Sequence, residues 1–204
     1  MILGILSAIL VLSYILGSIP TGYYLTKKST GLNILELGSG NIGSTNVKRI
    51  AGKKISIITQ LLDMLKGLIP VGIVQLLIIY GIIESPPYYI YLVALATIIG
   101  HDYSLFLKFK GGKGVNTTLG ASLLIAPISV FVSVAIYYLF KWRLKYVSLA
   151  SILLGLSLPI TSFIINGISY LTYYLAISAA IILIRHKTNI NRLINRTEPS
   201  SISK

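Results

Sequence analysis

The sequence predicts an all-α, polytopic integral membrane protein, and three observations carry this prediction. The chain of 204 residues is 54% hydrophobic and only 11% charged, whereas about a quarter of the residues of soluble proteins are charged. Its mean hydropathy is +0.82. Its apolar residues form long runs, and a helical run of about 20 residues covers about 30 Å of hydrocarbon. We therefore expect a single transmembrane helical domain over residues 1–204.

Seven transmembrane helices are predicted. The first apolar run covers residues 1–20 and lacks the basic start and the small-residue cleavage site of a signal peptide, so we expect it to be retained as a span. The other apolar runs cover residues 55–83, 88–99, 115–140, 147–165 and 168–184. Because Ala126-Pro127 interrupts the run at 115–140, we assign two short or tilted spans to it. A single crossing there gives the alternative of six spans.

The basic residues predict how the chain is oriented. Of the 18 Lys and Arg residues, 17 fall in four clusters between the apolar runs, at 27–54, 108–113, 141–145 and from 185 onward. Cytoplasmic loops are enriched in Lys and Arg, so all four clusters are expected on the cytoplasmic side. This places the N-terminus outside and the C-terminus in the cytoplasm. The net charge of +13 then reflects orientation, and we expect no nucleic-acid partner because no separate basic domain exists.

The composition also limits the chemistry. With no cysteine, two histidines and five acidic residues, the chain lacks thiolate ligands and has few other groups that could hold a metal. We therefore predict no metal and no cofactor.

The first polar segment, about residues 26–54, is a candidate anion site. Glycines let backbone N–H groups approach an anion closely, hydroxyls and amides add hydrogen bonds, and Arg49 can bind phosphate in a bidentate manner. The residues of this set are Gly38, Ser39, Gly40, Asn41, Gly43, Thr45 and Asn46. The glycine spacing also matches the dinucleotide fingerprint, which is rejected because no strand precedes it. A flexible loop is the alternative, but a polar helix start follows the glycines at once.

The second polar segment, about residues 100–115, ends in a lysine among glycines. Lys113 could present a cation and free amides to a phosphate, with Gly111, Gly112 and Gly114 around it. It is not a P-loop, because that motif needs Ser or Thr directly after the lysine. The alternation of Phe106 and Phe109 with Lys108 and Lys110 is typical of a membrane interface.

The third polar segment covers about residues 185–198. His186 and Asn189 are three residues apart and share a helical face, so they can converge on one ligand. Taken alone, an interfacial histidine is more often a structural group. Arg192 and Arg196 are interpreted as anchors to anionic lipid, with Glu198 as a local ion partner. The tail at about 199–204 is predicted to be disordered.

Two charged residues lie inside the second long apolar run. Asp63 and Lys66 are three apart and can pair, and each unpaired charge in a bilayer would cost about 2.5–3.5 kcal/mol or more. We interpret them as a structural ion pair near the inner interface rather than as catalytic groups.

Together the three polar segments resemble the three cytoplasmic motifs of the bacterial acyl-phosphate:glycerol-3-phosphate acyltransferases, the PlsY-type family. The resemblance covers nearly the whole chain. The matching stretches are Gly38 to Val47 with Arg49, Gly100-His101 through Phe109 to Val115, and His186 to Leu193 with Glu198. Segments Gly17–Gly22 and Asp63–Gly67 are also similar. The chain departs from the usual pattern at Ser44 and Asn116 (usually Ala), Tyr103-Ser104 (Phe-Pro), Lys187 (Arg) and Arg196 (Gly).

The resemblance implies transfer of a fatty acyl group from acyl phosphate to sn-glycerol 3-phosphate, giving 1-acyl-sn-glycerol 3-phosphate and phosphate in phospholipid biosynthesis. An acyl phosphate already has a good leaving group, so direct transfer without an acyl-enzyme is expected. The implied partners are these substrates and membrane lipid, with no obligate protein partner. The implied location is the bacterial plasma membrane, with the active site facing the cytoplasm. The expected catalytic residues are Ser39, Arg49, Lys113, His186 and Asn189.

Other functions remain open on the sequence alone. A phosphate or organophosphate transporter would also use cations and glycine loops, but its site should lie near the bilayer midplane. A non-enzymatic membrane assembly factor would not need the hydroxyls and amides of residues 39–46. An acyltransferase that uses acyl-CoA or acyl carrier protein would keep the reaction and change the donor.

Overall fold

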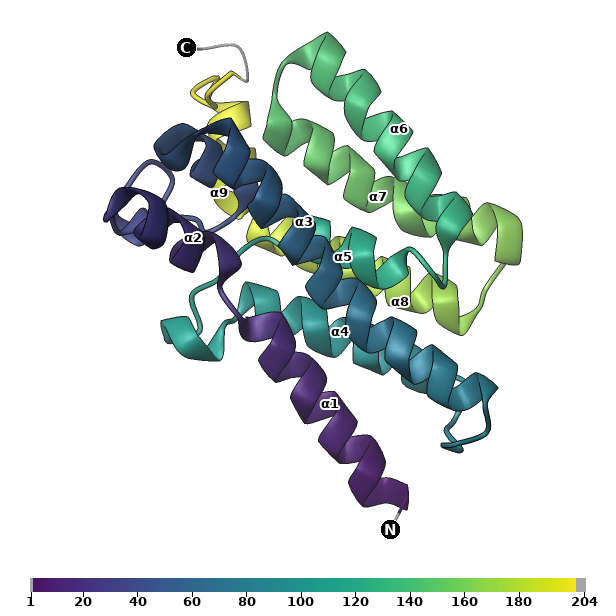
Figure 1. Ribbon diagram of the computed structural model, residues 1–204. Coiled ribbons are helices and arrows are strands. Elements are labelled where there is room, and N and C mark those ends of the chain that lie inside the picture. Colours follow the sequence, from purple (N-terminus) through teal and green to yellow (C-terminus); the bar gives the residue numbers. More distant parts are fainter. Residues whose placement is uncertain (1, 201–204) are drawn as a thin grey trace. The chain divides into compact units, whose positions relative to one another are not determined.

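The computed structural model describes residues 2–200, which form helices and no strands (Figure 1). This confirms the all-α prediction. The α-helices are α1 (Ile2–Ser18), α2 (Thr21–Thr30), α3 (Ser44–Ile79), α4 (Tyr89–Asp102), α5 (Val115–Ser122), α6 (Pro127–Leu144), α7 (Val147–Asn166), α8 (Tyr170–Arg185) and α9 (Lys187–Ile194). Short 3-10 helices lie at Ile34–Glu36 and Leu105–Leu107.

The chain divides into two compact units, one ending at Leu124 and the other beginning at Ile125. The first unit contains α1 to α5 and the second contains α6 to α9. The single domain expected over residues 1–204 stays a prediction. Of the tail predicted to be disordered, residues 201–204 lie outside the described part of the chain.

Four helical stretches within the described residues are long and apolar enough to cross a bilayer. They are Ile2–Thr30, Ser44–Ile79, Tyr89–Leu107 and Val147–Asn166, and Tyr170–Arg185 is a shorter apolar helix. These stretches contain or closely match five of the predicted apolar runs. The structure therefore supports a chain that crosses a membrane several times.

Small residues bring the helices of the first unit into close contact. α1 lies along α4, and α3 lies along α5 (Figure 1). A side chain added at Gly17 of α1 would overlap the backbone of Thr97 in α4, and one at Gly120 of α5 would overlap the backbone of Met64 in α3. Because backbone atoms cannot turn aside, a larger residue would push the helices apart. Membrane helices commonly pack through such small residues.

The first polar segment contains more helix than the sequence predicts. The segment at 26–54 holds the end of α2, a 3-10 helix and the first turns of α3. α2 follows Pro20 directly and ends at Gly31, whose φ of 74° is left-handed. This short polar helix lacks the apolar periodicity that would reveal it in a sequence.

α3 is 36 residues long and is interrupted at Gly52, where φ is 83° and ψ is 175°. This backbone conformation is essentially restricted to glycine. The Ser56 hydroxyl donates to the carbonyl oxygen of Ser44 (2.8 Å) and so joins the two parts of the helix. The interruption separates a short polar piece, which carries Arg49, from the long apolar piece that was predicted as a span.

The predicted break near Ala126-Pro127 is confirmed. α5 ends at Ser122 and α6 begins at Pro127. α5 has only 8 residues, a length of about 12 Å at 1.5 Å per residue. This covers less than half of the hydrocarbon thickness, so α5 alone is too short for a full crossing.

The second unit is a set of helices joined by short connections. Two residues join α6 to α7, and three residues join α7 to α8. Such short connections make neighbouring helices antiparallel. Ser157 of α7 donates to Ser133 of α6 (2.8 Å), and both side chains are buried. α9 follows α8 after a single residue, His186.

Candidate functional site

Asn46 holds the loop of the first motif in shape. Its side-chain oxygen accepts from the backbone N–H of Ser39 (3.1 Å), and its amide donates to the carbonyl oxygens of Leu37 (3.0 Å) and Asn41 (2.9 Å). The residue is only 1% exposed. Gly38 has a φ of 59°, and a side chain there would overlap the Asn46 amide. The side chain of Asn46, which was predicted as a substrate ligand, therefore forms hydrogen bonds within the loop itself.

The first and second motifs meet through Asn41. Its side-chain oxygen accepts from the N–H of Gly43 (2.8 Å), and its amide donates to the carbonyl oxygen of Gly111 (3.2 Å). A second link joins Asn116 to the Ser44 hydroxyl (3.4 Å). The structure thus brings the two motifs together at one end of the first unit, as a shared phosphate site requires.

The glycines of the second motif pack against the end of α4. The N–H of Gly112 donates to the carbonyl oxygen of His101 (2.9 Å). A side chain on Gly112 would overlap the His101 ring, and one on Gly111 would overlap the backbone of His101. The Gly112 amide is therefore used within the loop. Gly114 directly precedes α5, has a φ of 72° and lies beside the buried carboxylate of Asp102.

The predicted phosphate-binding side chains differ in exposure. Arg49 lies exposed in the short first piece of α3, and within residues 2–200 its guanidinium forms no hydrogen bond or ion pair. Lys113 is half-buried in the second motif. Ser39 and Thr45 are exposed on the first motif. This end of the first unit thus presents cations and hydroxyls to incoming anions.

The third motif lies in the second unit and is held by Glu198. One carboxylate oxygen accepts from the Asn189 amide (2.7 Å), and the other pairs with Arg192 (2.7 Å). The ion partner predicted for Glu198 is therefore confirmed. Burial alone would raise the pKa of Glu198, but hydrogen bonds from Ser148, Arg192 and Asn189 and the charge of Arg192 hold this pKa below its ordinary value.

This pKa predicts a pH-dependent contribution to stability. Because the pKa of Glu198 is lowered from 4.5 in the folded chain, its stabilisation is complete above that pH and is lost as the pH falls through the lower folded value. We expect Glu198→Gln to lower the unfolding temperature in detergent at pH 7, by an amount that shrinks below pH 4.5. The control is Glu84→Gln, at an exposed turn. A difference that does not change with pH would contradict this assignment.

His186 is fixed at the junction of α8 and α9. The side chain is 2% exposed, and its Nδ1 lies 2.8 Å from the carbonyl oxygen of Ile182. A carbonyl only accepts, so Nδ1 carries the proton and Nε2 carries the lone pair of the neutral ring. Asn189, 5% exposed, follows one turn later on α9. The two predicted residues are thus held in defined positions within the second unit.

The predicted pair of Asp63 and Lys66 is confirmed, and it belongs to a larger cluster. Lys66 Nζ lies 2.9 Å from Asp63 Oδ1, and both side chains are buried. The same carboxylate oxygen accepts from the Thr21 hydroxyl (2.6 Å) and lies 3.7 Å from Nδ1 of His101. The sequence showed the pair at helical spacing but not the two partners from other helices.

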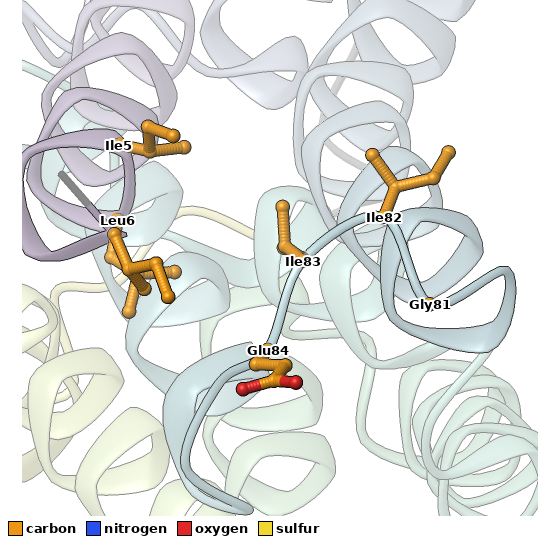
Figure 2. Close-up of a pocket in the computed structure, with 7 residues that line it drawn as sticks. Ile5, Leu6, Gly81, Ile82, Ile83 and Glu84 are labelled. Atoms are coloured by element: carbon orange, nitrogen blue, oxygen red, sulfur yellow. The ribbon is translucent and has the colours of Figure 1, made fainter.

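A hollow elsewhere in the first unit has a different character (Figure 2). It has a volume of about 250 Å³ and lies between the start of α1 and the turn after α3, lined by Ile2, Ile5, Leu6, Gly81, Ile82, Ile83 and Glu84. At its other end α1 contacts the second polar segment, where the Ser104 hydroxyl donates to the carbonyl oxygen of Ser18. Since Glu84 is the ionisable residue in this lining, the hollow does not suit a phosphate.

The comparisons with known proteins agree with these motifs. The family profile described as glycerol-3-phosphate acyltransferase matches residues 7–196. The chain is 46% identical over 189 residues to the glycerol-3-phosphate acyltransferase of Clostridium acetobutylicum, which covers 91% of this chain and 94% of the relative. The enzyme of that name from Syntrophotalea carbinolica is 41% identical over 189 residues, which is 93% of this chain and 94% of the relative.

Two solved structures are also similar, both of PlsY, described as an integral membrane glycerol 3-phosphate acyltransferase. The glycerol 3-phosphate form has a TM-score of 0.86 and 36% identity, over 96% of this chain and 94% of that chain. The lysophosphatidic acid form has a TM-score of 0.82 and 35% identity over the same shares. These relatives favour an acyltransferase over the transporter alternative. The present chain is a multi-pass membrane acyltransferase and belongs to the glycerol-3-phosphate acyltransferase family.

Proposed function

We propose that the chain transfers a fatty acyl group from an acyl phosphate to sn-glycerol 3-phosphate, giving 1-acyl-sn-glycerol 3-phosphate and inorganic phosphate. The observation that carries this proposal is the meeting of the first two motifs through Asn41 and Gly111. Both substrates carry phosphate, and this end of the first unit carries Arg49 and Lys113. The relatives named above support the acceptor, because one PlsY structure is a glycerol 3-phosphate form.

The roles of the first-unit residues follow from their charge and position. Arg49 and Lys113 hold substrate phosphates, since guanidinium and ammonium groups form short, charge-assisted hydrogen bonds to phosphate oxygens. Ser39 orients the reacting groups. The backbone of Gly111-Gly112 helps to bind glycerol 3-phosphate, the other glycines of the two motifs let phosphate approach the backbone, and Thr45 adds a hydrogen bond. Asn41 and Asn46 keep the loop in shape for the phosphates.

The roles of His186 and Asn189 rest on the third motif. Nε2 of the neutral His186 ring takes the proton of the acceptor hydroxyl, or a substrate phosphate takes it while His186 orients the hydroxyl. Asn189, together with Ser39, orients the reacting groups or stabilises the oxyanion that develops on the acyl carbonyl.

The reaction proceeds by direct transfer in a ternary complex. The acceptor oxygen forms a bond to the acyl carbon, and the bond from that carbon to the phosphate oxygen breaks. The phosphate leaves with the electron pair, and the hydroxyl proton goes to the base. Because phosphate is a good leaving group, positioning and charge stabilisation supply the catalysis, and no enzyme nucleophile is needed.

The proposed membrane arrangement has seven spans, with the N-terminus outside and the C-terminus in the cytoplasm. The four basic clusters support it through the enrichment of Lys and Arg in cytoplasmic loops. The break between α5 and α6 supports two segments in the interval 115–140. Because α5 alone is too short for a full crossing, seven spans require α5 to cross together with the residues that flank it. The site then lies on the cytoplasmic side of the bacterial plasma membrane. There it can take water-soluble glycerol 3-phosphate from the cytoplasm and the acyl donor from the lipid.

The first test is phosphate release by the purified protein in lipid vesicles, with palmitoyl phosphate as donor and with or without glycerol 3-phosphate. We expect release that depends on the acceptor and equals the lysophosphatidic acid formed, with no turnover of palmitoyl-CoA. Turnover of palmitoyl-CoA alone would assign a different donor. Folded protein without turnover, but with phosphate flux into the vesicles, would overturn the proposal in favour of transport.

The cysteine-free sequence allows a direct test of orientation. Ser44 lies at the start of α3 beside the motifs, and Ser85 lies in the turn between α3 and α4. Both serines are half-buried, which makes them a matched pair. In intact cells, a membrane-impermeant thiol reagent should label Ser85→Cys and leave Ser44→Cys unlabelled until the cells are opened. Labelling of Ser44→Cys in intact cells would overturn the orientation.

A further inference from the structure

The buried cluster around Asp63 joins three helices of the first unit and the connection between α1 and α2. Asp63 of α3 accepts from Thr21 at the start of α2 and pairs with Lys66. Lys66 Nζ also donates to the carbonyl oxygen of Ile19 (3.1 Å), which follows α1. His101, near the end of α4, approaches the same Asp63 oxygen. Buried charges in membrane proteins are costly and commonly mark function, and the reaction proposed above uses none of these groups.

His101 differs from the other members because it also contacts the glycine loop of the second motif. Its carbonyl oxygen accepts from the N–H of Gly112. Its ring lies so close to Gly112 that a side chain there would overlap Nε2. The imidazole therefore lies between Asp63, on its Nδ1 side, and the loop that carries Lys113, on its Nε2 side.

The loop of the second motif is thus held from two directions. Asn41 of the first motif holds the carbonyl oxygen of Gly111 (3.2 Å). His101 holds the N–H of Gly112 (2.9 Å) and forms a wall against that residue. Lys113 is the next residue, so the orientation of the His101 ring bears directly on the position of the ammonium group. Catalytic and binding groups need such support to be held within about 0.5 Å of their productive positions.

We propose that Asp63 and His101 are positioning residues that fix the loop Gly111–Lys113 for the phosphate of glycerol 3-phosphate. This inference rests on the proposed function. Asp63 fixes the imidazole by its charge, and the imidazole fixes the glycine loop by its shape and its backbone carbonyl. Because this loop is assigned to the acceptor phosphate, disturbing the cluster is expected to change the binding of glycerol 3-phosphate more than the binding of the acyl donor.

The test compares KM values for the two substrates in His101→Asn and Asp63→Asn. An asparagine at 101 keeps a donor near the position of Nδ1 but removes the wall against Gly112. We expect each variant to raise the KM for glycerol 3-phosphate at least tenfold, while kcat and the KM for palmitoyl phosphate change less than threefold. The control is Thr21→Val, which removes one hydrogen bond to Asp63 but keeps both the carboxylate and the His101 ring, and it should lower the unfolding temperature without this KM shift.

A double variant tests the contact between the ring and the glycine. Gly112→Ala alone should be strongly impaired, because its methyl group meets the His101 ring. In the presence of His101→Asn the same methyl group has room, so the double variant should be no worse than His101→Asn alone. Full additivity of the two losses would overturn the proposed contact.

The outcomes separate this inference from the proposed function. Acceptor-dependent turnover by the unaltered protein establishes the reaction, whatever the variants do. With that turnover in place, an unchanged KM for glycerol 3-phosphate in folded His101→Asn, or an equal rise in both KM values, overturns the positioning role alone. If His101→Asn does not fold, Asp63→Asn decides, because it keeps the side-chain volume and the oxygen that accepts from Thr21. Absence of turnover in the unaltered protein overturns both proposals.

Discussion

Replacing Arg49 by alanine is expected to lower kcat/KM by about 10²–10³-fold, the loss typical for removing one donor to a developing or bound anion. Arg49 is exposed, and its guanidinium has no partner within the described chain, so the substitution removes a ligand to phosphate without breaking an internal contact. The unfolding temperature should therefore stay unchanged. The measurement is phosphate release at varied concentrations of each substrate.

The neighbouring Lys48 provides the matched control, because it is also exposed on the first turns of α3. Lys48→Ala should retain nearly full activity. Lys113→Ala should lose activity as Arg49→Ala does, with exposed Lys110→Ala as its control. Retained activity in Arg49→Ala or Lys113→Ala would remove that residue from the proposed site.

Replacing His186 is expected to lower kcat by about 10²–10⁴-fold, the usual contribution of a general base. The informative variant is His186→Asn, because an asparagine amide can still donate to the carbonyl oxygen of Ile182 while Nε2 is lost. The fold of the α8–α9 junction is thereby kept. The loss should be accompanied by disappearance of the acidic limb of the pH profile of kcat.

The competing assignment gives a different result. If a substrate phosphate takes the proton, His186→Asn should leave the pH profile of kcat unchanged. Near-normal turnover in this variant would also exclude the orienting role of His186. His186→Ala then reports the structural part separately, because it also removes the donor to Ile182. A fall in unfolding temperature without loss of kcat in folded protein would assign His186 to the structure alone.

The sequence predicts much of the fold, because apolar runs report burial in lipid directly. The predicted run at 147–165 corresponds to Val147–Asn166, and the run at 168–184 corresponds to Tyr170–Arg185. Proline marks the break before α6 for a local steric reason. By contrast, α2 is short and polar, and the interruption at Gly52 lies in a polar stretch where no pattern changes. Neither leaves a periodic signal that a sequence could show.

The same distinction applies to the candidate site. The pair of Asp63 and Lys66 was visible because helical spacing alone brings residues three apart together. Thr21 and His101, the other partners of Asp63, come from distant parts of the chain and depend on tertiary packing. Asn46 illustrates the reverse case. Its residue type indicated a ligand for substrate, whereas in the structure its side chain hydrogen-bonds to the backbone of the loop.

Several of the departures from the usual family pattern have a structural explanation. Ser44 and Asn116 both replace alanine, and they hydrogen-bond to each other across the two motifs (3.4 Å). Ser104 stands where proline is usual, and its hydroxyl donates to the carbonyl oxygen of Ser18 (2.5 Å). Arg196 stands where glycine is usual, and its backbone is left-handed, with a φ of 56°. Nothing in the structure explains why arginine is used at this position.

The interruption of α3 has a consequence for suppressor genetics. At Gly72 an added methyl group would meet the end of the Leu124 side chain, so a smaller residue at position 124 could restore the fit. At Gly52 nothing lies within 4 Å of an added methyl group, yet the backbone there has a φ of 83°. An added side chain at Gly52 thus has room, and what disfavours an L-residue there is the positive φ of its own backbone. A damaging substitution at Gly52 should therefore have no second-site suppressor among its neighbours, and only reversion to glycine, or a residue of D configuration introduced by synthesis, would restore the chain.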